Sequence, residues 1–283
     1  ACLIPAPYWT SSPEMVKAAG GTPVTVPSDE KDGFRLRPDV LKKHITKRTR
    51  AIILNSPSNP TGAVYTEAEL KALAKVLEPT DVWVISDDIY EKLVYGGARF
   101  LSLAALCPAL KARAVVVNGV SKTYAMTGWR IGYAAGPKAV IDAAGRLQSQ
   151  STSNPTSIAQ KAALAALQGD QGCVAQMVAE YDKRRQHIVK RLNAIPGVSC
   201  IEPHGAFYAF PRVDGLYGKS CDGVRLQGSF ALASALLDKA RLAVVPGAAF
   251  GDDAYIRLSY ATSMAVIDKG LDRLDAFARG LKE

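Results

Sequence analysis

The chain has 283 residues, a formal net charge of +9 and 48% hydrophobic residues. This composition excludes disordered, collagen-like and coiled-coil proteins, and the length suits one large or two modest domains. No apolar run reaches the roughly 18 residues that a membrane-spanning helix needs, and the N-terminus shows no signal-peptide pattern. We therefore expect a cytoplasmic protein with no membrane partner.

Neither the cysteines nor the basic residues point to a metal site or a nucleic-acid interface. The five cysteines are scattered, with no CxxC spacing and no neighbouring histidine cluster, so we expect reduced thiols and no bound metal. Seven Lys and Arg residues lie between positions 35 and 50. No aromatic residues alternate with them to stack on bases, so this stretch is interpreted as a solvated helix face, with no nucleic acid bound.

Six short apolar segments alternate with helical patterns in the first half of the chain. The predicted strands are Leu3–Pro5, Pro23–Val26, Ala51–Leu54, Val82–Ser86, Ala114–Asn118 and Ile131–Ala135. The third, fourth and fifth are near-continuous apolar runs, which is typical of parallel strands buried on both faces. Between them, Thr66 and Glu69 form a capping box that starts a helix. This strand-helix-strand order predicts an α/β open sheet.

The pattern changes after about residue 150. Two helices are expected near Ser157–Leu167 and Cys173–Ala194, followed by a mixture of short elements. The short strands are expected at Ala206–Phe210, Ala243–Val245 and Tyr255–Ser259, and two further helices near Ser229–Arg241 and Met264–Leu281. We therefore predict a large domain over 1–180 and a smaller α+β domain over 181–283, bridged by the long helix.

Polar clusters follow three of the predicted parallel strands. They are Asn55–Gly62, Asp87–Tyr90 and Gly119–Gly132. In open α/β sheets, ligands bind at the carboxyl ends of the strands. Three clusters at adjacent strand ends, each with a chemically competent group, therefore predict one binding site at this edge of the sheet.

These clusters resemble the class I aminotransferases of fold type I, which depend on pyridoxal phosphate. The matching motifs are NSPSNPTG, ISDDIY, GVSKTYAMTGWRIGY and YIRLSYA, in the order in which the family has them, and they cover nearly the whole chain. The segments PAPYW, PEM and GAFY are most similar to aspartate and prephenate aminotransferases. The resemblance implies a mostly parallel large-domain sheet with flanking helices, plus a smaller α+β C-terminal domain.

The resemblance also implies roles for the cofactor-binding residues. Lys122 resembles the lysine that forms the internal aldimine and then moves the substrate proton. Asp87 resembles the carboxylate that pairs with the protonated pyridine nitrogen and keeps the ring an electron sink. Tyr90 and Asn59 resemble the partners of the cofactor's phenolate oxygen, and Arg130 resembles the arginine that binds its phosphate.

Further roles are carried over for the cofactor ring and the substrate. Trp9 resembles the aromatic residue that stacks on the pyridine ring and borders the substrate. Arg257 resembles the arginine that binds the substrate α-carboxylate in a bidentate manner, and Asn59 lies beside the same substrate. Gly119 stands where many family members carry Ser or Thr toward the phosphate, so Ser121 is expected to supply that hydroxyl.

The expected activity is transamination between an L-amino acid and a 2-oxo acid, with aspartate and 2-oxoglutarate as the best-supported pair and ping-pong kinetics. A cofactor-dependent β-lyase on the same fold is an alternative, because fold alone does not fix the reaction. A second alternative is the aminotransferase-like effector domain of a transcription regulator. The PAPYW segment and Arg257 favour the enzyme.

The family's opening segment has no counterpart before Ala1, so the resemblance implies an N-terminally truncated chain. We expect a homodimer when the protein is full length. In the family that segment covers one edge of the sheet, beside the strand that Ile131–Ala135 resembles. We therefore expect residues 1–283 alone to expose this edge, to aggregate and to turn over no substrate.

Overall fold

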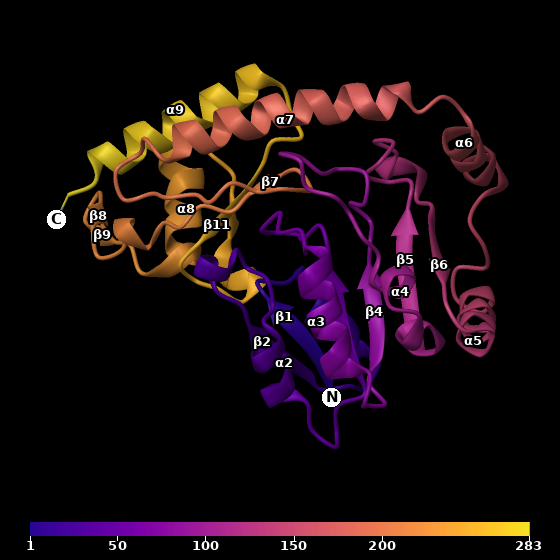
Figure 1. The fold of residues 1–283 in the computed structure, drawn as a ribbon. Helices are drawn as coiled ribbons and strands as arrows, with labels where there is room; N and C mark the ends of the chain where they lie inside the picture. Colours follow the sequence, from indigo (N-terminus) through magenta and orange to yellow (C-terminus); the bar gives the residue numbers. More distant parts are fainter. Residues whose placement is uncertain (283) are drawn as a thin grey trace.

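Six strands form the main sheet of the computed structural model, which describes residues 1–282 (Figure 1). Their order is β2-β1-β3-β4-β5-β6, with β1 to β5 parallel and β6 antiparallel to β5. The strands are β1 (Cys2–Ala6), β2 (Pro23–Pro27), β3 (Ala51–Asn55), β4 (Trp83–Asp87), β5 (Ala114–Gly119) and β6 (Gly132–Ala135). All six predicted strands are confirmed, each end within one residue.

One face of this sheet is covered by helices. They are α2 (Pro38–His44), α3 (Glu67–Leu77) and α4 (Leu103–Leu106). Alternate strand residues such as Ile52, Leu54 and Val84 point to this face, where they pack with Leu73 and Leu77 of α3 in one buried cluster. The predicted capping box that starts α3 is present. The helix stripe and the strand alternation therefore produce this core together.

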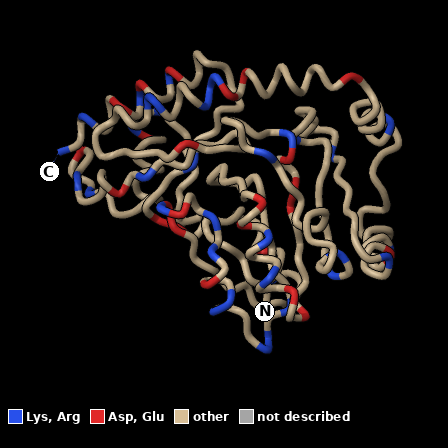
Figure 2. The backbone as a smooth tube through the Cα atoms, viewed as in Figure 1, with Lys and Arg blue, Asp and Glu red and all other residues tan. Residues whose placement is uncertain are grey.

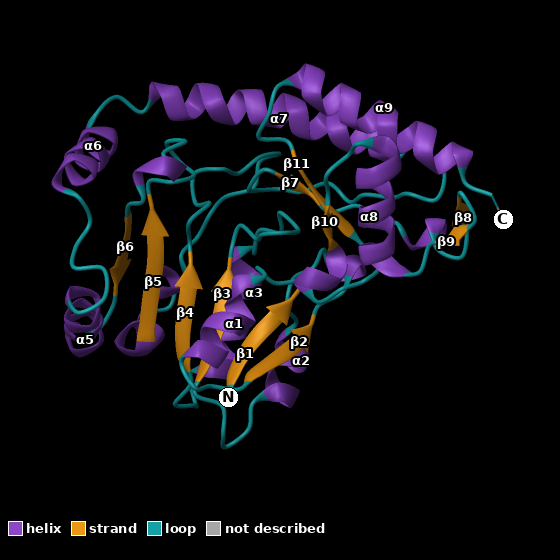
Figure 3. Cartoon of the chain, turned by 180° about the vertical axis from the view of Figure 1, so that it is seen from behind, coloured by secondary structure: helices purple, strands orange, loops and turns teal. Residues whose placement is uncertain are grey.

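The opposite face is covered only in part, by α1 (Ser11–Ala18), as Figure 3 shows from behind. Val16 of α1 packs on Cys2 and Ile4 of β1. Farther along the sheet an apolar groove of about 530 Å³ lies over β3, β4 and β5, and Val117 at its side is 38% exposed. All four residues of the edge strand β6 are exposed.

Three helices lead from β6 to the second half of the chain: α5 (Lys138–Ser149), α6 (Ser157–Gln168) and α7 (Gly172–Leu192). The predicted helices near residues 157 and 173 are thus confirmed. Helix α7 runs beside α9 (Met264–Gly280) across the upper side of the molecule in Figure 1. Arg191 of α7 forms an ion pair with Asp268 of α9, and the His187 ring nitrogen lies within hydrogen-bond distance of the same carboxylate, so the two helices are joined by polar contacts as well as by apolar packing.

The C-terminal half contains a small antiparallel sheet in the order β10-β11-β7. Its elements, with the helix between them, are β7 (Tyr208–Ala209), α8 (Gly228–Ala240), β10 (Val245–Pro246) and β11 (Ile256–Ser259). A two-residue hairpin, β8 (Ser220–Cys221) and β9 (Val224–Arg225), lies outside it. The apolar core here joins α7, α8 and α9 to Tyr90, Leu93 and Tyr95, which follow β4, so the end of β4 is packed against the C-terminal half.

Charged residues of both signs are interspersed along the whole fold (Figure 2). Within residues 1–282, no helix is long and apolar enough to cross a membrane. In the same part of the chain, no group of three His, Cys, Asp or Glu side chains is arranged to hold a metal ion.

Candidate active site

The carboxyl ends of β3, β4 and β5 meet at one edge of the main sheet. The ladder pairs Asn55 at the end of β3 with Asp87 at the end of β4. The Asn55 side chain fixes the loop that follows it, because its Nδ2 donates to the Asp87 carbonyl at 3.0 Å and its Oδ1 accepts from the Asn59 amide at 2.8 Å. The structure therefore brings two of the three predicted clusters together through backbone contacts.

Asp87 is a partly buried carboxylate without a cationic partner. Its Oδ1 accepts the Ile89 amide at 3.2 Å, and no ion pair joins it to any residue in the described part of the chain. Burial raises the pKa of Asp87 to about 6, and the neighbouring Asp88 adds to this rise. A carboxylate in this position is suited to a protonated ring nitrogen, whose charge would offset the burial.

Lys122 follows β5 and lies among aromatic rings. Its Nζ is 5.9 Å from the ring centroid of Tyr90 and 5.7 Å from that of Phe207. Burial lowers the pKa of Lys122, and the positive charges of Arg130 and Arg257 lower it further. The amine is therefore shifted toward the neutral form, which is the nucleophilic one.

The predicted phosphate-binding residues lie beyond Lys122. Arg130 takes a left-handed backbone conformation with φ of 55°, which is uncommon for a residue with a side chain and is often found at functional sites. Its Nη1 donates to the Thr127 carbonyl at 2.6 Å, and its guanidinium is exposed. Ser121 is half-buried next to Lys122.

Gly119, the last residue of β5, explains one departure from the family pattern. A Cβ at this position would lie 2.8 Å from the Ile131 carbonyl oxygen and 3.0 Å from the Cα of Gly132. The close approach of β5 and β6 therefore excludes the Ser or Thr that many family members carry here. Any hydroxyl toward a phosphate must come from another residue.

Arg257 projects from β11 and is enclosed by protein groups. Its guanidinium carbon lies 4.4 Å from the ring centroid of Tyr208 and 5.0 Å from that of Phe250. Its Nη1 donates to Oδ1 of Asn59 at 2.9 Å, whereas its buried Nε has no partner in the described residues. One donor edge of the guanidinium thus remains available for a carboxylate.

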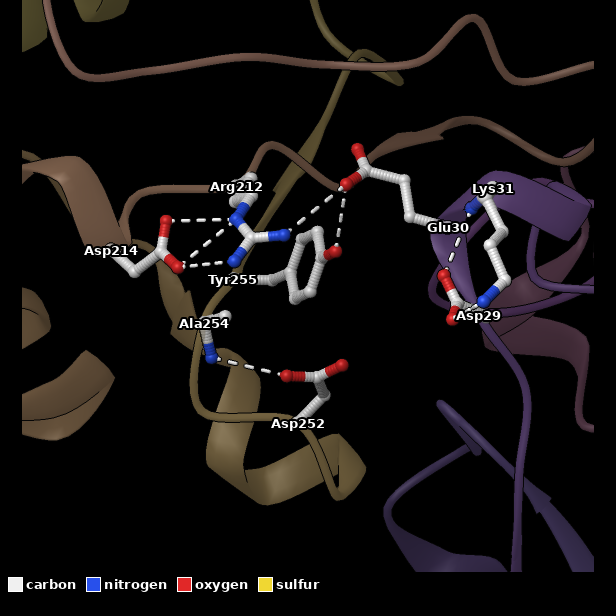
Figure 4. Close-up of polar contacts among 8 residues, drawn as sticks. All are labelled: Asp29, Glu30, Lys31, Arg212, Asp214, Asp252, Ala254 and Tyr255. Carbon is white, nitrogen blue, oxygen red and sulfur yellow. Dashed lines mark hydrogen bonds and ion pairs between the residues drawn. The ribbon is translucent and has the colours of Figure 1, made fainter.

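Strand β11 is tied to the N-terminal half two residues before Arg257 (Figure 4). The Tyr255 hydroxyl donates to Oε2 of Glu30 at 3.0 Å, and Nη1 of Arg212 lies 3.7 Å from the same oxygen. The Tyr255 ring stacks on Phe210 at 4.8 Å between centroids. The contacts to Glu30 hold the strand that carries Arg257 against the N-terminal half of the chain.

The remaining predicted residues also lie at this edge. Trp9 is 38% exposed and borders the apolar groove together with Asp87. Tyr90 is buried, and its hydroxyl lies 2.9 Å from the Tyr208 hydroxyl. The structure thus groups Asp87 with Trp9, Lys122 with Tyr90, and Asn59 with Arg257. It adds Phe207, Tyr208 and Phe250, to which the sequence analysis assigned no role. The first two belong to the GAFY segment that the sequence analysis singled out, and Phe250 had no signal in it.

Comparison with known proteins agrees with this geometry. The family model described as aminotransferase class I and II matches residues 1–274. The chain belongs to this family. The resemblance drawn from the motifs is therefore confirmed, and transamination is the activity of the chain.

Individual aminotransferases match over nearly the whole chain. It is 51% identical to the aspartate aminotransferase of Geobacillus stearothermophilus, over 97% of this chain and 69% of that protein. It is also 51% identical to the aspartate/prephenate aminotransferase of Cereibacter sphaeroides, over 99% of this chain and 70% of that protein. The chain thus spans about 70% of the length of these relatives.

Solved aminotransferase structures have the same fold. The aspartate aminotransferase from Rhizobium meliloti superposes with a TM-score of 0.96 at 46% identity, covering 99% of this chain and 71% of that one. The aromatic aminotransferase from Pyrococcus horikoshii gives a TM-score of 0.90 at 42% identity, with 97% and 72% covered. The predicted α/β class with the fold-type-I arrangement is confirmed, and the enzyme interpretation is favoured over the effector domain of a transcription regulator.

Proposed function

We propose that this aminotransferase transfers the amino group of aspartate to 2-oxoglutarate, using pyridoxal phosphate and ping-pong kinetics. The names of the relatives support aspartate as the donor. The main support for the cofactor assignment is that two groups without ion-pair partners in the described residues, a carboxylate and an amine, lie close together at the strand ends. Asp87 lacks a cation, and Lys122 is an amine with a lowered pKa close to it.

The side chains fit the groups of this cofactor. Asp87 would accept the ring N–H, and Trp9 would stack on the ring from the groove. Tyr90 would donate to the phenolate oxygen. Arg130 would bind the phosphate through its free guanidinium edge, with a hydroxyl contact from Ser121.

Three residues act on the substrate. When bound, pyridoxal phosphate supplies an electron sink beside the substrate Cα. Nζ of Lys122, whose pKa is lowered by burial, takes the proton from Cα and returns it. Arg257 binds the α-carboxylate through its available donor edge, and Asn59, bonded to Arg257, also faces the substrate and the phenolate oxygen. The carboxylate is thereby fixed relative to Lys122.

The organisation of the protein is part of the same proposal. Residues 1–180 form the large cofactor-binding domain and 181–283 the small domain, with Arg257 supplied by the latter. The full-length protein works as a homodimer in the cytoplasm.

The test is a coupled assay with the protein as its gene encodes it. Aspartate and 2-oxoglutarate should yield oxaloacetate and glutamate. Borohydride treatment with pyridoxal phosphate, followed by peptide mapping, should place the label on Lys122. Lys122→Ala should abolish both results, whereas Lys75→Ala, at an exposed lysine on α3, should change neither. Release of pyruvate and ammonia without a 2-oxo acid would indicate the β-lyase instead.

A further inference from the structure

Tyr208 on β7 contacts both Tyr90 and Arg257, and the sequence analysis gave it no role. It is only 7% exposed. Its hydroxyl lies 2.9 Å from the Tyr90 hydroxyl, and its ring lies 4.4 Å from the guanidinium carbon of Arg257. The two tyrosine rings meet edge to face, with centroids 5.9 Å apart. One side chain thus contacts the group proposed for the phenolate oxygen and the group proposed for the substrate carboxylate.

The hydrogen bond between the two hydroxyls uses only one of their two O–H donors. The other O–H can donate to a third group. Each phenol has one O–H donor and can also accept. Within the described residues, neither hydroxyl has a hydrogen-bond partner other than the other tyrosine. If Tyr208 donates to Tyr90, the Tyr90 O–H is available for a third group. Burial raises the pKa of both tyrosines, so both keep their protons at neutral pH.

We propose that Tyr208 is a positioning residue for the transamination reaction. Its hydroxyl donates to Tyr90 and so strengthens the Tyr90 hydrogen bond to the cofactor's phenolate oxygen, while its ring holds the Arg257 guanidinium in the orientation that binds the α-carboxylate. The inference deepens the proposed function and rests on it. Hydrogen bonds in a chain polarise one another, so the Tyr208 donor makes Tyr90 a stronger donor than an isolated phenol.

The sign of the expected effect follows from this chain. A strong Tyr90 donor lowers the basicity of the phenolate oxygen. Without the Tyr208 hydroxyl, that oxygen would be more basic and would hold a proton more tightly. The pKa of the pH-dependent visible absorbance of the holoenzyme should therefore rise when the Tyr208 hydroxyl is removed.

Tyr208→Phe removes the hydroxyl and keeps the ring. The pKa of the visible band should rise by about one to three tenths of a unit, because one bond in a chain strengthens its neighbour by about 10–30%. The kcat should fall by up to about twofold, with KM for aspartate almost unchanged. The matched control is Tyr95→Phe, because the Tyr95 hydroxyl is also buried in the same core and bonds at 2.6 Å to the Ala206 carbonyl, away from the site. The control should lose thermal stability to a similar extent without shifting the band.

Tyr208→Leu tests the second half of the proposal, since it removes the ring as well. KM should now rise for every amino acid substrate, because all share the α-carboxylate that Arg257 binds. A visible-band pKa and a kcat in Tyr208→Phe that match those of Tyr95→Phe would overturn the proposal while the proposed function stands. If the wild-type holoenzyme carries no label on Lys122, the proposed function fails first, and this inference fails with it.

Discussion

The two halves of the candidate site are held in place in different ways. Asp87 is the last residue of β4 and is paired with Val117 of β5, and Lys122 follows the end of β5 by three residues, so the main sheet sets their positions. Arg257 takes its place from side chains, among them two aromatic rings and an Asn59 that lies 198 residues away. A backbone ladder does not depend on any one side chain. The side chains that surround Arg257, in contrast, can be removed one contact at a time. Substitutions in the first half should therefore affect chemistry alone, and those in the second half should have graded effects on binding.

The largest effect is expected at the strand ends. Asp87→Asn should still bind cofactor through Lys122, but kcat should fall by about 10²–10³-fold, because the carboxylate that stabilises the developing charge is gone. Asp88→Asn is the matched control. Asp88 is more deeply buried and accepts the Ser86 hydroxyl at 2.6 Å, and an amide oxygen can replace it there. Steady-state kinetics of the two variants measure the difference. An unchanged kcat in Asp87→Asn would contradict the assigned role.

A smaller effect is expected at Arg257. Arg257→Lys keeps the charge but loses the planar donor edge, so kcat/KM should fall about 10- to 100-fold for every amino acid alike. Cofactor uptake should be unchanged, since the strand ends are intact. Kinetics with aspartate and with a monocarboxylic amino acid measure this. A loss confined to dicarboxylic substrates would mean that Arg257 reads the substrate side chain.

The smallest effect is expected at the contact between β11 and the N-terminal half. Tyr255→Phe keeps the stack on Phe210 and removes only the hydrogen bond to Glu30. KM should rise about two- to fivefold, the effect of one hydrogen bond, with kcat unchanged. Substrate-saturation curves at constant cofactor detect the change. If KM does not move, the aromatic packing alone positions the strand.

The main sheet could be predicted from the sequence because its strands are buried runs separated by clear helix signals. The sequence analysis predicts neither α1 nor α5. Helix α1 has eight residues, and Thr10 before it makes no side-chain cap. Helix α5 does carry apolar residues at helical spacing, Val140, Ala144 and Leu147, which the prediction overlooked. None of the residues of α5 is buried, so its apolar stripe faces no core within the described residues.

The strand-end residues of the site could be predicted for a geometric reason, since parallel strands bring their carboxyl ends to one edge. The position of Lys122 and Asp87 at this edge followed from that rule alone, whereas their roles stay a prediction that rests on the family motifs. The aromatic surroundings of Arg257 could not be predicted in the same way. Tyr208 and Phe250 reach Arg257 from β7 and from the turn before β11, and no spacing along the chain encodes that meeting.

The enclosure of Arg257 has an entropic consequence for the substrate-binding role proposed for it. Fixing a long arginine side chain costs about 1.5–2 kcal/mol of rotamer freedom. The rings of Tyr208 and Phe250 and the Asn59 oxygen impose that restriction through protein groups alone, so it is incurred when the chain folds. A carboxylate that arrives later finds the guanidinium already ordered, and its binding loses less conformational entropy than binding to a mobile surface arginine would.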